Sequence, residues 1–377
     1  MVIHAFRSRA LLAGAVSVVI GSALAACGSS SGGTASGGGS SGSSQSSFKI
    51  AYSNSMLGNT FHQVLIANAK STAASGQKQG LISKFTISDA NGSASTQAQQ
   101  IRSFIVQHYN AIIVDAGSAT ALNSAIQQAC SAGIIVVAVN ETVTAPCAYN
   151  VLEHYPMETQ LQIQAIGQEL HGQGTILDDR GIAGTLPETL FQQGINAGLK
   201  QYPKLKIVGS VYGQWTSTIT DQQISQALPS LPKVQAVVSE GAGEVGVVQA
   251  FKTAHRPVPL VYFGNAGADL RLWASLLKTN PSYHIFSISS FPSVSGFGIW
   301  TAISLLQHKA KLKSKTIWFP LLQIKQNTLQ AWIAATPPDS QASFPFTLAQ
   351  TQALLKVEPN VPAVITPGPN GSIPGLK

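Results

Sequence analysis

The feature that most constrains the fold is the regular alternation of short apolar runs with segments of helical spacing. Each run is rich in β-branched and aliphatic residues, and each following segment repeats apolar residues at i, i+3 and i+4. Such runs are typical of parallel strands buried on both faces, and their alternation with helices predicts an α/β fold. In the first half we expect strands at 48–53, 84–88, 111–114 and 134–139 and helices at 61–74, 96–108 and 119–132.

The same pattern repeats in the second half of the chain, so we predict two α/β halves of similar size. Strands are expected at 174–182, 206–211, 234–239, 259–263 and 284–289, and helices at 188–201, 219–227, 245–253, 270–277 and 297–307. Residues 317–324 should be extended, and a short helix is expected near 348–355. The rest of the C-terminal region, rich in Pro, Ser and Thr, should be irregular.

The N-terminal region predicts export. Arg7 and Arg9 precede a small apolar run that ends in the order Leu-Ala-Ala-Cys at Cys27. The run is shorter than the about 20 apolar residues of a membrane-spanning helix, so 1–26 is better interpreted as a lipoprotein signal peptide. A lipid is then expected on Cys27, and the Gly/Ser-rich segment 27–47 should be a flexible tether. We expect the protein at the outer face of the cell membrane or in the periplasm.

Composition argues against nucleic acid as a partner. The net charge is +8 and only 10% of residues are charged. The basic residues are scattered apart from Lys309, Lys311, Lys313 and Lys315, which we interpret as a solvated helix end and loop. A nucleic-acid interface would need a stripe of Arg with interleaved aromatic residues.

Two cysteines remain beside Cys27, and we predict that they form a disulfide. Cys130 and Cys147 flank the apolar strand at 134–139, and export would place them in an oxidising compartment. The alternative is two free thiols. The sequence has no Cys-x-x-Cys, so neither a redox motif nor a cysteine zinc site is indicated.

No motif predicts catalysis, a metal or a cofactor. GxSxG and HExxH are absent, and no nucleophile stands in a pattern with a base. The charged groups at Glu153, His154 and Glu158 are interpreted as structural or solvated, and 178–180 as a charged loop. A GxGxxG at 241–246 lies between a predicted strand and helix, but no acidic residue follows the next strand to hold a ribose. We interpret it as a tight turn.

Polar residues recur at the carboxyl ends of the predicted strands, where ligands bind in open parallel sheets. They are Ser53, Asp89, Asp115, Asn140, Glu240, Asn265 and Ser290. Each alone is an ordinary loop residue, but their recurrence indicates a ligand site.

Several motifs in order give the chain a family resemblance. They are Asn59-Thr60-Phe61-His62, Asp89-Ala90-Asn91-Gly92 with Gln97 and Gln100, Ala132-Gly133-Ile134 through Val139-Asn140, Gly213-Gln214-Trp215, and Ser290-Phe291-Pro292. The chain resembles the ribose-binding-like sugar receptors of ABC importers. The resemblance implies the type I periplasmic binding protein fold, with two Rossmann-like lobes joined by three crossovers. It implies lobe one at 48–141 and 291–316, lobe two at 142–290 and 317–365, and a tail at 366–377.

The resemblance also implies a set of ligand-binding residues between the lobes. They are Asn59, Phe61, His62, Asp115, Asn140, Glu141, Phe191, Trp215, Glu240, Asn265 and Ser290. Relatives that bind pentoses carry Asp-Arg at Asn140-Glu141 and a second Arg at Phe191. Because Arg supplies a fork of donors, its loss shifts the site toward acceptors and apolar surface. A sugar fits such a site, and a polyol, a nucleoside or an amine remains open.

The resemblance implies a monomeric receptor that captures a small molecule, most simply a carbohydrate, and delivers it to an ABC permease and its ATPase. Such a protein is no enzyme. An alternative is a receptor that presents its ligand to a chemoreceptor or sensor kinase. An exported enzyme would need a catalytic constellation, and a transcription regulator of related fold would need a DNA-binding segment before Phe48.

Overall fold

The computed structural model describes residues 47–58 and 60–374. Residues Gln45–Lys377 belong to one compact unit. The predicted signal peptide, Cys27 and most of the Gly/Ser-rich segment lie outside the described residues, as does Asn59. Among the described residues, no helix has the length and apolar character needed to cross a membrane.

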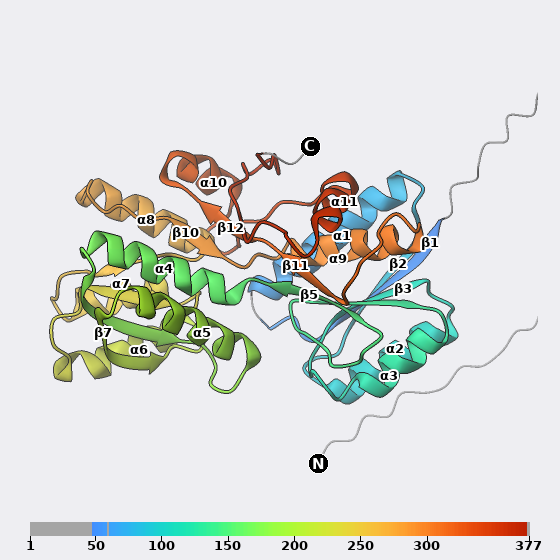
Figure 1. The fold of residues 1–377 in the computed structure, drawn as a ribbon, viewed down its shortest axis with the longest axis horizontal. Helices are drawn as coiled ribbons and strands as arrows, with labels where there is room; N and C mark the ends of the chain where they lie inside the picture. The colour runs from blue at the N-terminus through green and yellow to red at the C-terminus, as the bar shows by residue number, and fades with distance from the viewer. Residues whose placement is uncertain (1–46, 59, 375–377) are drawn as a thin grey trace, which may run out of the picture. The chain divides into compact units, whose positions relative to one another are not determined.

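The first sheet consists of six parallel strands in the order β11-β5-β4-β3-β1-β2 (Figure 1). They are β1 (Phe48–Asn54), β2 (Ile82–Asp89), β3 (Ala111–Asp115), β4 (Ile135–Val139), β5 (Tyr149–Glu153) and β11 (Thr316–Phe319). The central strand β3 is buried along its whole length. This burial explains why its sequence is an unbroken apolar run rather than an alternating one.

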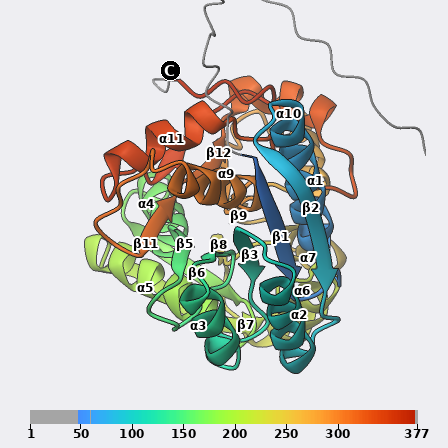
Figure 2. The ribbon, with the colours of Figure 1, turned by 90° about the vertical axis from the view of Figure 1, so that its right-hand side faces the viewer.

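Helices cover both faces of this sheet. They are α1 (Thr60–Lys78), α9 (Val294–Leu306) and α11 (Leu348–Val357) on one side, and α2 (Ala94–Val106) and α3 (Asn123–Ser131) on the other (Figure 2). Ile113 and Val137 join the core under α1 and α9, whereas Ile112 and Val136 join the core under α2 and α3. Successive strand residues point to opposite faces, so each central strand contributes to two cores.

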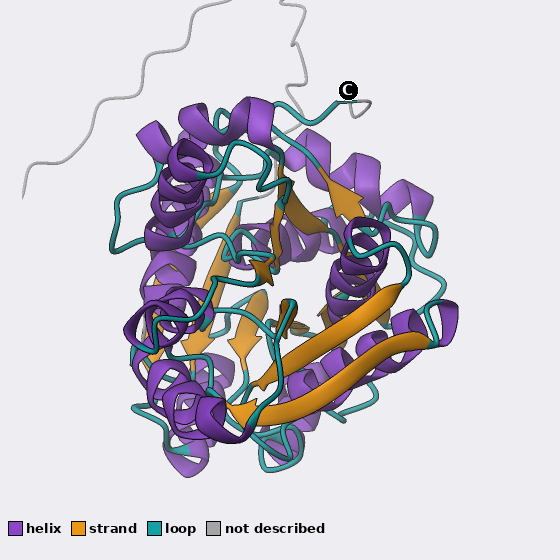
Figure 3. Ribbon diagram, turned by 90° about the vertical axis from the view of Figure 1, so that its left-hand side faces the viewer, coloured by secondary structure: helices purple, strands orange, loops and turns teal. Residues whose placement is uncertain are grey.

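The second sheet is parallel, in the order β7-β6-β8-β9, and is also covered on both faces (Figure 3). Its strands are β6 (Gln173–Arg180), β7 (Lys204–Tyr212), β8 (Ala236–Ser239) and β9 (Leu260–Val261). The helices of this half are α4 (Tyr155–Glu169), α5 (Leu186–Gln201), α6 (Ser217–Ala227), α7 (Glu244–Thr253), α8 (Gly267–Thr279) and α10 (Leu329–Ala335). Asp178 of β6 contacts Gln192 of α5, and Asp179 contacts Thr220 of α6, so α5 and α6 lie on opposite faces.

A third, small sheet joins β10 (Ser287–Ser289), β12 (Leu321–Ile324) and β13 (Val364–Ile365). β10 and β12 pair antiparallel, and β12 and β13 pair parallel. The extended segment predicted at 317–324 is divided at Pro320, which has no N–H to donate to a ladder. Its first part is β11 in the first sheet, and its second part is β12 in the third.

The α/β class and most of the predicted elements are confirmed, but β5, α4, α10 and β13 were not expected. Both α10 and β13 lie in the C-terminal region that was predicted to be irregular. The lobe boundaries stay a prediction. Because β5 and β11 pair within the first sheet, we propose that lobe one also contains these two strands.

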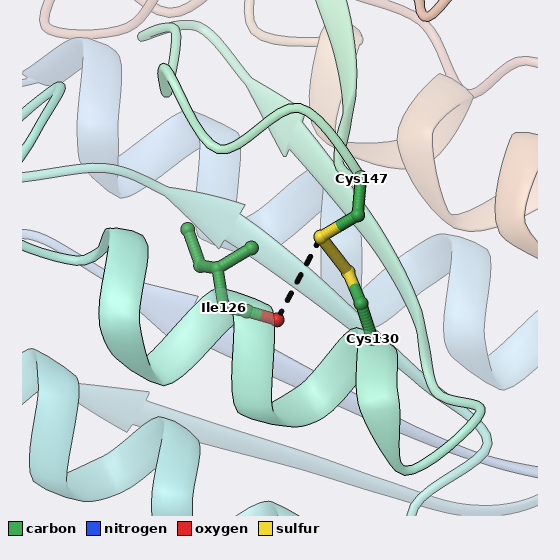
Figure 4. The surroundings of a disulfide bond; sticks show 3 residues. All are labelled: Ile126, Cys130 and Cys147. Atoms are coloured by element: carbon green, nitrogen blue, oxygen red, sulfur yellow. Dashed lines mark hydrogen bonds between the residues drawn. A yellow bond between two sulfur atoms is a disulfide. The ribbon is translucent and has the colours of Figure 1, made fainter.

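The predicted disulfide is formed between Cys130, at the end of α3, and Cys147, in the segment after β4 (Figure 4). The Sγ atom of Cys147 also lies 4.0 Å from the carbonyl oxygen of Ile126. The bond closes a loop with a sequence separation of 17 and fixes the segment that returns the chain from β4 to β5.

Reducing this disulfide should lower the free energy of unfolding by about 3 kcal/mol, because a loop of this size then regains its chain entropy in the unfolded state. The measurement is urea unfolding with and without reductant. The double variant Cys130→Ser, Cys147→Ser should show the same loss and no further response to reductant. Equal stability of the oxidised and reduced protein would contradict the prediction.

Candidate functional site

At the carboxyl end of β3, Asp115 gathers several residues into one cluster. The side chain is fully buried, and both of its carboxylate oxygens accept hydrogen bonds. Ser55 Oγ donates to Oδ2 at 3.0 Å, and Asn140 Nδ2 donates to Oδ1 at 2.9 Å. His62 Nε2 lies 3.4 Å from Oδ2. Three predicted site residues, His62, Asp115 and Asn140, therefore meet, together with Ser55, which was not among the predicted site residues.

Local structure explains how Asp115 is held. The buried side chain of Gln97 donates to the Asp115 carbonyl at 2.7 Å and accepts from Gly117 N at 2.8 Å, which fixes the turn after β3. Asn140 has a φ of 64°, a left-handed conformation that Asn tolerates better than most residues. This conformation lets the Asn140 amide turn back toward Asp115.

Glu141 adds a carboxyl group to this cluster without a hydrogen bond to any described residue. Burial and, to a lesser extent, the charge of Asp115 raise its pKa from 4.5 to about 7, against the opposing effect of His62. Near neutral pH the group is therefore divided between a charged acceptor and a protonated donor. Phe61 stands beside the cluster, with its ring centroid 5.9 Å from that of His62.

A chain of contacts runs from this cluster to the second sheet through Tyr155, in the first turn of α4. The Tyr155 hydroxyl donates to Glu153 Oε2 at 2.7 Å and lies 3.4 Å from the Asn140 carbonyl. Its ring packs edge-on against Phe191 of α5, with centroids 5.1 Å apart. Phe191 is only 4% exposed, so most of its surface is already covered by protein.

Glu240, which follows β8, is the corresponding buried carboxyl of the second sheet. Gly181 N donates to Oε2 at 2.7 Å, and Gln192 Nε2 donates to Oε1 at 2.9 Å. The same Gln192 amide lies 3.1 Å from Asp178 Oδ2. Burial raises the pKa of Glu240 to about 7 and that of Asp178 to about 6.

The interpretation of 178–180 as a charged loop is wrong. These residues end β6, and Asp178 is 3% exposed. Arg180 donates from Nε to Glu188 Oε1 at 2.9 Å, so its charge is already paired. The missed signal was position: an acid directly after an apolar strand, as at Asp115, points into the carboxyl edge of the sheet.

Trp215 lies beside the Glu240 contact. Its indole covers Gly181 so closely that a Cβ added there would be 2.2 Å from the ring. Gly181 is therefore the residue type that allows the indole to approach the amide bound by Glu240. Trp215 is half-buried, so part of the residue is exposed to solvent.

Asn265 and Ser290 contact protein atoms where the sheets meet. Asn265 is 2% exposed, donates to the Leu322 carbonyl at 3.1 Å and accepts from Ser287 Oγ. Ser290 N donates to Glu158 Oε2 at 3.1 Å. Glu158 is buried, which fits the structural alternative of its interpretation and not the solvated one. The ligand contacts expected for Asn265 and Ser290 stay predictions.

The buried acids influence one another across the molecule. Burial raises the pKa of Glu158 well above its ordinary value, and the charges of Glu153, Glu244 and Glu240 raise it further. The site is thus rich in carboxyl groups, which accept hydrogen bonds when charged and also donate one when protonated. No group of three His, Cys, Asp or Glu residues in the described part of the chain could hold a metal ion.

The GxGxxG segment forms the turn between β8 and α7. A Cβ on Gly243 would lie 2.3 Å from Asp179 Oδ2, and one on Gly246 would lie 2.0 Å from the Ser217 carbonyl oxygen. These glycines allow α7 to approach β6 and α6. Close packing therefore accounts for the motif without a dinucleotide.

The chain is similar to known solute-binding proteins. The family described as periplasmic binding protein domain matches residues 50–310. An ABC transporter solute binding protein from Thermobispora bispora is 30% identical, with a TM-score of 0.71, and the match covers 84% of this chain and 100% of that one. A solute binding protein from Actinobacillus succinogenes with bound D-allose is 18% identical, with a TM-score of 0.62, and the match covers 75% of this chain and 99% of that one.

A curated relative matches over a shorter stretch. The xylitol-binding protein of Mycolicibacterium smegmatis is 31% identical over 176 residues, which cover 46% of this chain and 50% of that protein. This chain therefore spans about half the length of the curated relative in the match.

The buried acids predict a fall in stability as pH rises. Burial raises the pKa of Glu153 from 4.5 to about 8, so between these values the folded protein retains a proton that the unfolded chain has released. The free energy of unfolding should therefore decrease through this window. Glu153→Gln should make the decrease shallower by about 1 kcal/mol per pH unit, measured by urea unfolding at several pH values.

The matched control is Glu169→Gln, an exposed glutamate at the end of α4. It should leave the pH dependence unchanged. The prediction fails if Glu153→Gln and the wild type lose stability in parallel as pH rises.

Proposed function

Because the chain belongs to the periplasmic binding protein domain family, we propose that it captures a sugar or polyol outside the cytoplasm and delivers it to an ABC import permease and its ATPase. The observation that carries this proposal is the pair of buried acceptor clusters, one around Asp115 and one around Glu240. Each follows a parallel strand of a different sheet, at the edge where ligands of such sheets bind. The relatives with xylitol in the name and D-allose in the structure support a hydroxyl-rich ligand.

The chemistry of the site fits such a ligand. Hydroxyl groups donate to carboxylates and to the Asn140 carbonyl, and aromatic faces such as Trp215 pack on C–H surfaces. Glu141 and Glu240, with pKa values near 7, can also be protonated and then donate to a ligand oxygen. A polyol, which offers both donors and acceptors, satisfies both states.

Ligand capture requires that the bound molecule contacts both halves of the protein. The chain passes between the sheets at His154, between Ser290 and Ser293, and at Pro320, and we assign the hinge to these three connections. A ligand stabilises the closed arrangement only by contacts that the open arrangement lacks. Closure, rather than any bond-making step, would be what the permease senses. The protein would act as a monomer.

We further propose that Cys27 carries a lipid. The support is the sequence order before Cys27 and the Gly/Ser-rich segment that follows it. A lipidated terminus would keep the receptor near its permease.

A ligand screen tests the proposed function. At least one sugar or polyol, with xylitol and D-allose in the panel, should raise the melting temperature, because a ligand that binds only the folded state stabilises it. Trp215→Ala should weaken binding of that ligand by about 1–3 kcal/mol in titration calorimetry, the range expected for a lost aromatic contact.

The control is Tyr202→Ala, which removes an aromatic ring of the second half that packs against Gly167. It should lower stability without changing affinity. The assignment is overturned if only nucleosides or amines raise the melting temperature, and the site is misplaced if both variants bind like the wild type.

Cys27→Ala should abolish incorporation of labelled fatty acid into the protein and move it from the membrane fraction to the soluble extracytoplasmic fraction. The readout is labelling followed by fractionation of cells that express the full chain. Retention of the label in the variant would place the lipid elsewhere.

A further inference from the structure

A cavity lies on the first sheet's side of the molecule, away from the acceptor clusters. It has a volume of about 390 Å³ and is formed by the loop after α9 and the end of α11. Four exposed lysines line it: Lys309, Lys311, Lys313 and Lys356. The two segments are distant in sequence, and the packing of α11 on α9 brings them together (Figure 2).

The positive charge of this lysine pocket is not balanced by the protein. Glu358 is the one acid among the described residues that line it, and its Oε1 accepts from Trp318 N at 2.8 Å. Burial raises the pKa of Glu358 to about 7, so at neutral pH its negative charge is incomplete. No pocket lysine lies in an ion pair with a carboxylate of the described residues. The pocket is therefore suited to an external anion.

The pocket lies at the end of the first sheet where β1 begins. Trp300 of α9 packs near Gly76, and the same glycine faces Ile82, which pairs with Phe48 at the start of β1. α9 continues about 9 Å beyond Trp300 to Leu306, and the pocket follows. Asp115 and Asn140 lie at the opposite, carboxyl end of the same strands.

The chain before Phe48 leads to Cys27 through the Gly/Ser-rich segment. If Cys27 is lipidated as proposed above, the short segment 28–47 joins the lipid to the end of the body at which the lysine pocket lies.

We propose that the lysine pocket binds the phosphate headgroups of anionic lipids and holds the first half of the protein against the membrane between deliveries. Lysines near an anionic bilayer are attracted by its surface potential, and the attraction falls off within a Debye length. The contact is therefore reversible and sensitive to salt. It leaves the carboxyl ends of the strands facing away from the bilayer, open to solute, and the receptor must leave the surface to present its site to the permease.

The test uses the unlipidated body, Gln45–Lys377, which forms one compact unit with its own cores. It should sediment with vesicles that contain phosphatidylglycerol, fail to sediment with pure phosphatidylcholine, and be released by high salt. Replacing the four pocket lysines with Gln should weaken vesicle binding by more than about tenfold.

The matched control removes four exposed lysines of the second half: Lys200→Gln, Lys204→Gln, Lys206→Gln and Lys233→Gln. It should retain most of the vesicle binding. Equal losses of vesicle binding in the two variants would show an effect of net charge and overturn the proposal that the pocket binds lipid. Equal binding of the wild-type body to both kinds of vesicle, or binding to neither, would also overturn it.

Two further measurements separate the sources of the anion and the two proposals. Calorimetric binding of inorganic phosphate without vesicle binding would identify a free anion and overturn the lipid proposal. The pocket variant should keep the wild-type increase in melting temperature with the sugar or polyol ligand. If the pocket variant loses vesicle binding but its melting temperature still rises with the sugar or polyol, the proposed lipid contact is supported. If the melting temperature rises in neither the wild type nor the pocket variant, only the proposed solute-binding function is contradicted.

Discussion

The arrangement of this protein depends on carboxyl groups buried at the ends of parallel strands. A buried charge is costly unless hydrogen bonds compensate it. Asp115 accepts hydrogen bonds from Ser55 and Asn140 in two neighbouring loops, and Glu240 accepts them from Gly181 and Gln192. The acids therefore fix the loops that form the candidate site, and the incomplete compensation at Glu240 explains why burial raises its pKa. The same groups that shape the site also make stability depend on pH.

Much of the fold could be predicted because the local sequence pattern identifies most strands and helices. The sequences of β3 and β4 are continuous apolar runs, which indicate strands buried on both faces of a sheet. β5 was missed because Asn150 interrupts its apolar character. In the structure that side chain accepts from Val143 N at 2.8 Å, so it holds the preceding loop in place rather than marking a turn. Such a role arises from contacts that strand periodicity does not encode.

The same distinction between local sequence pattern and long-range contact applies to the candidate site. His62, Asp115 and Asn140 could be named because each has a recognisable place in a motif, and the structure brings them together. Glu158 and Gln192 could not, because each acts on a partner far away in the chain: Ser290 for Glu158, and Glu240 for Gln192. Asn59 lies outside the described residues, so its place stays a prediction.

At Pro320, late in the sequence, the chain leaves the first sheet for the third, and this order affects how the protein folds while it is being synthesised. β11 completes the first sheet, and α11 covers α9, yet both come from the last quarter of the sequence. The N-terminal half emerges from the ribosome with its largest core unfinished, and contacts of long sequence separation form slowly. A chain that cannot complete either half early remains extended for longer, which is the state that a protein-conducting channel accepts. The interleaved topology thus favours translocation before folding.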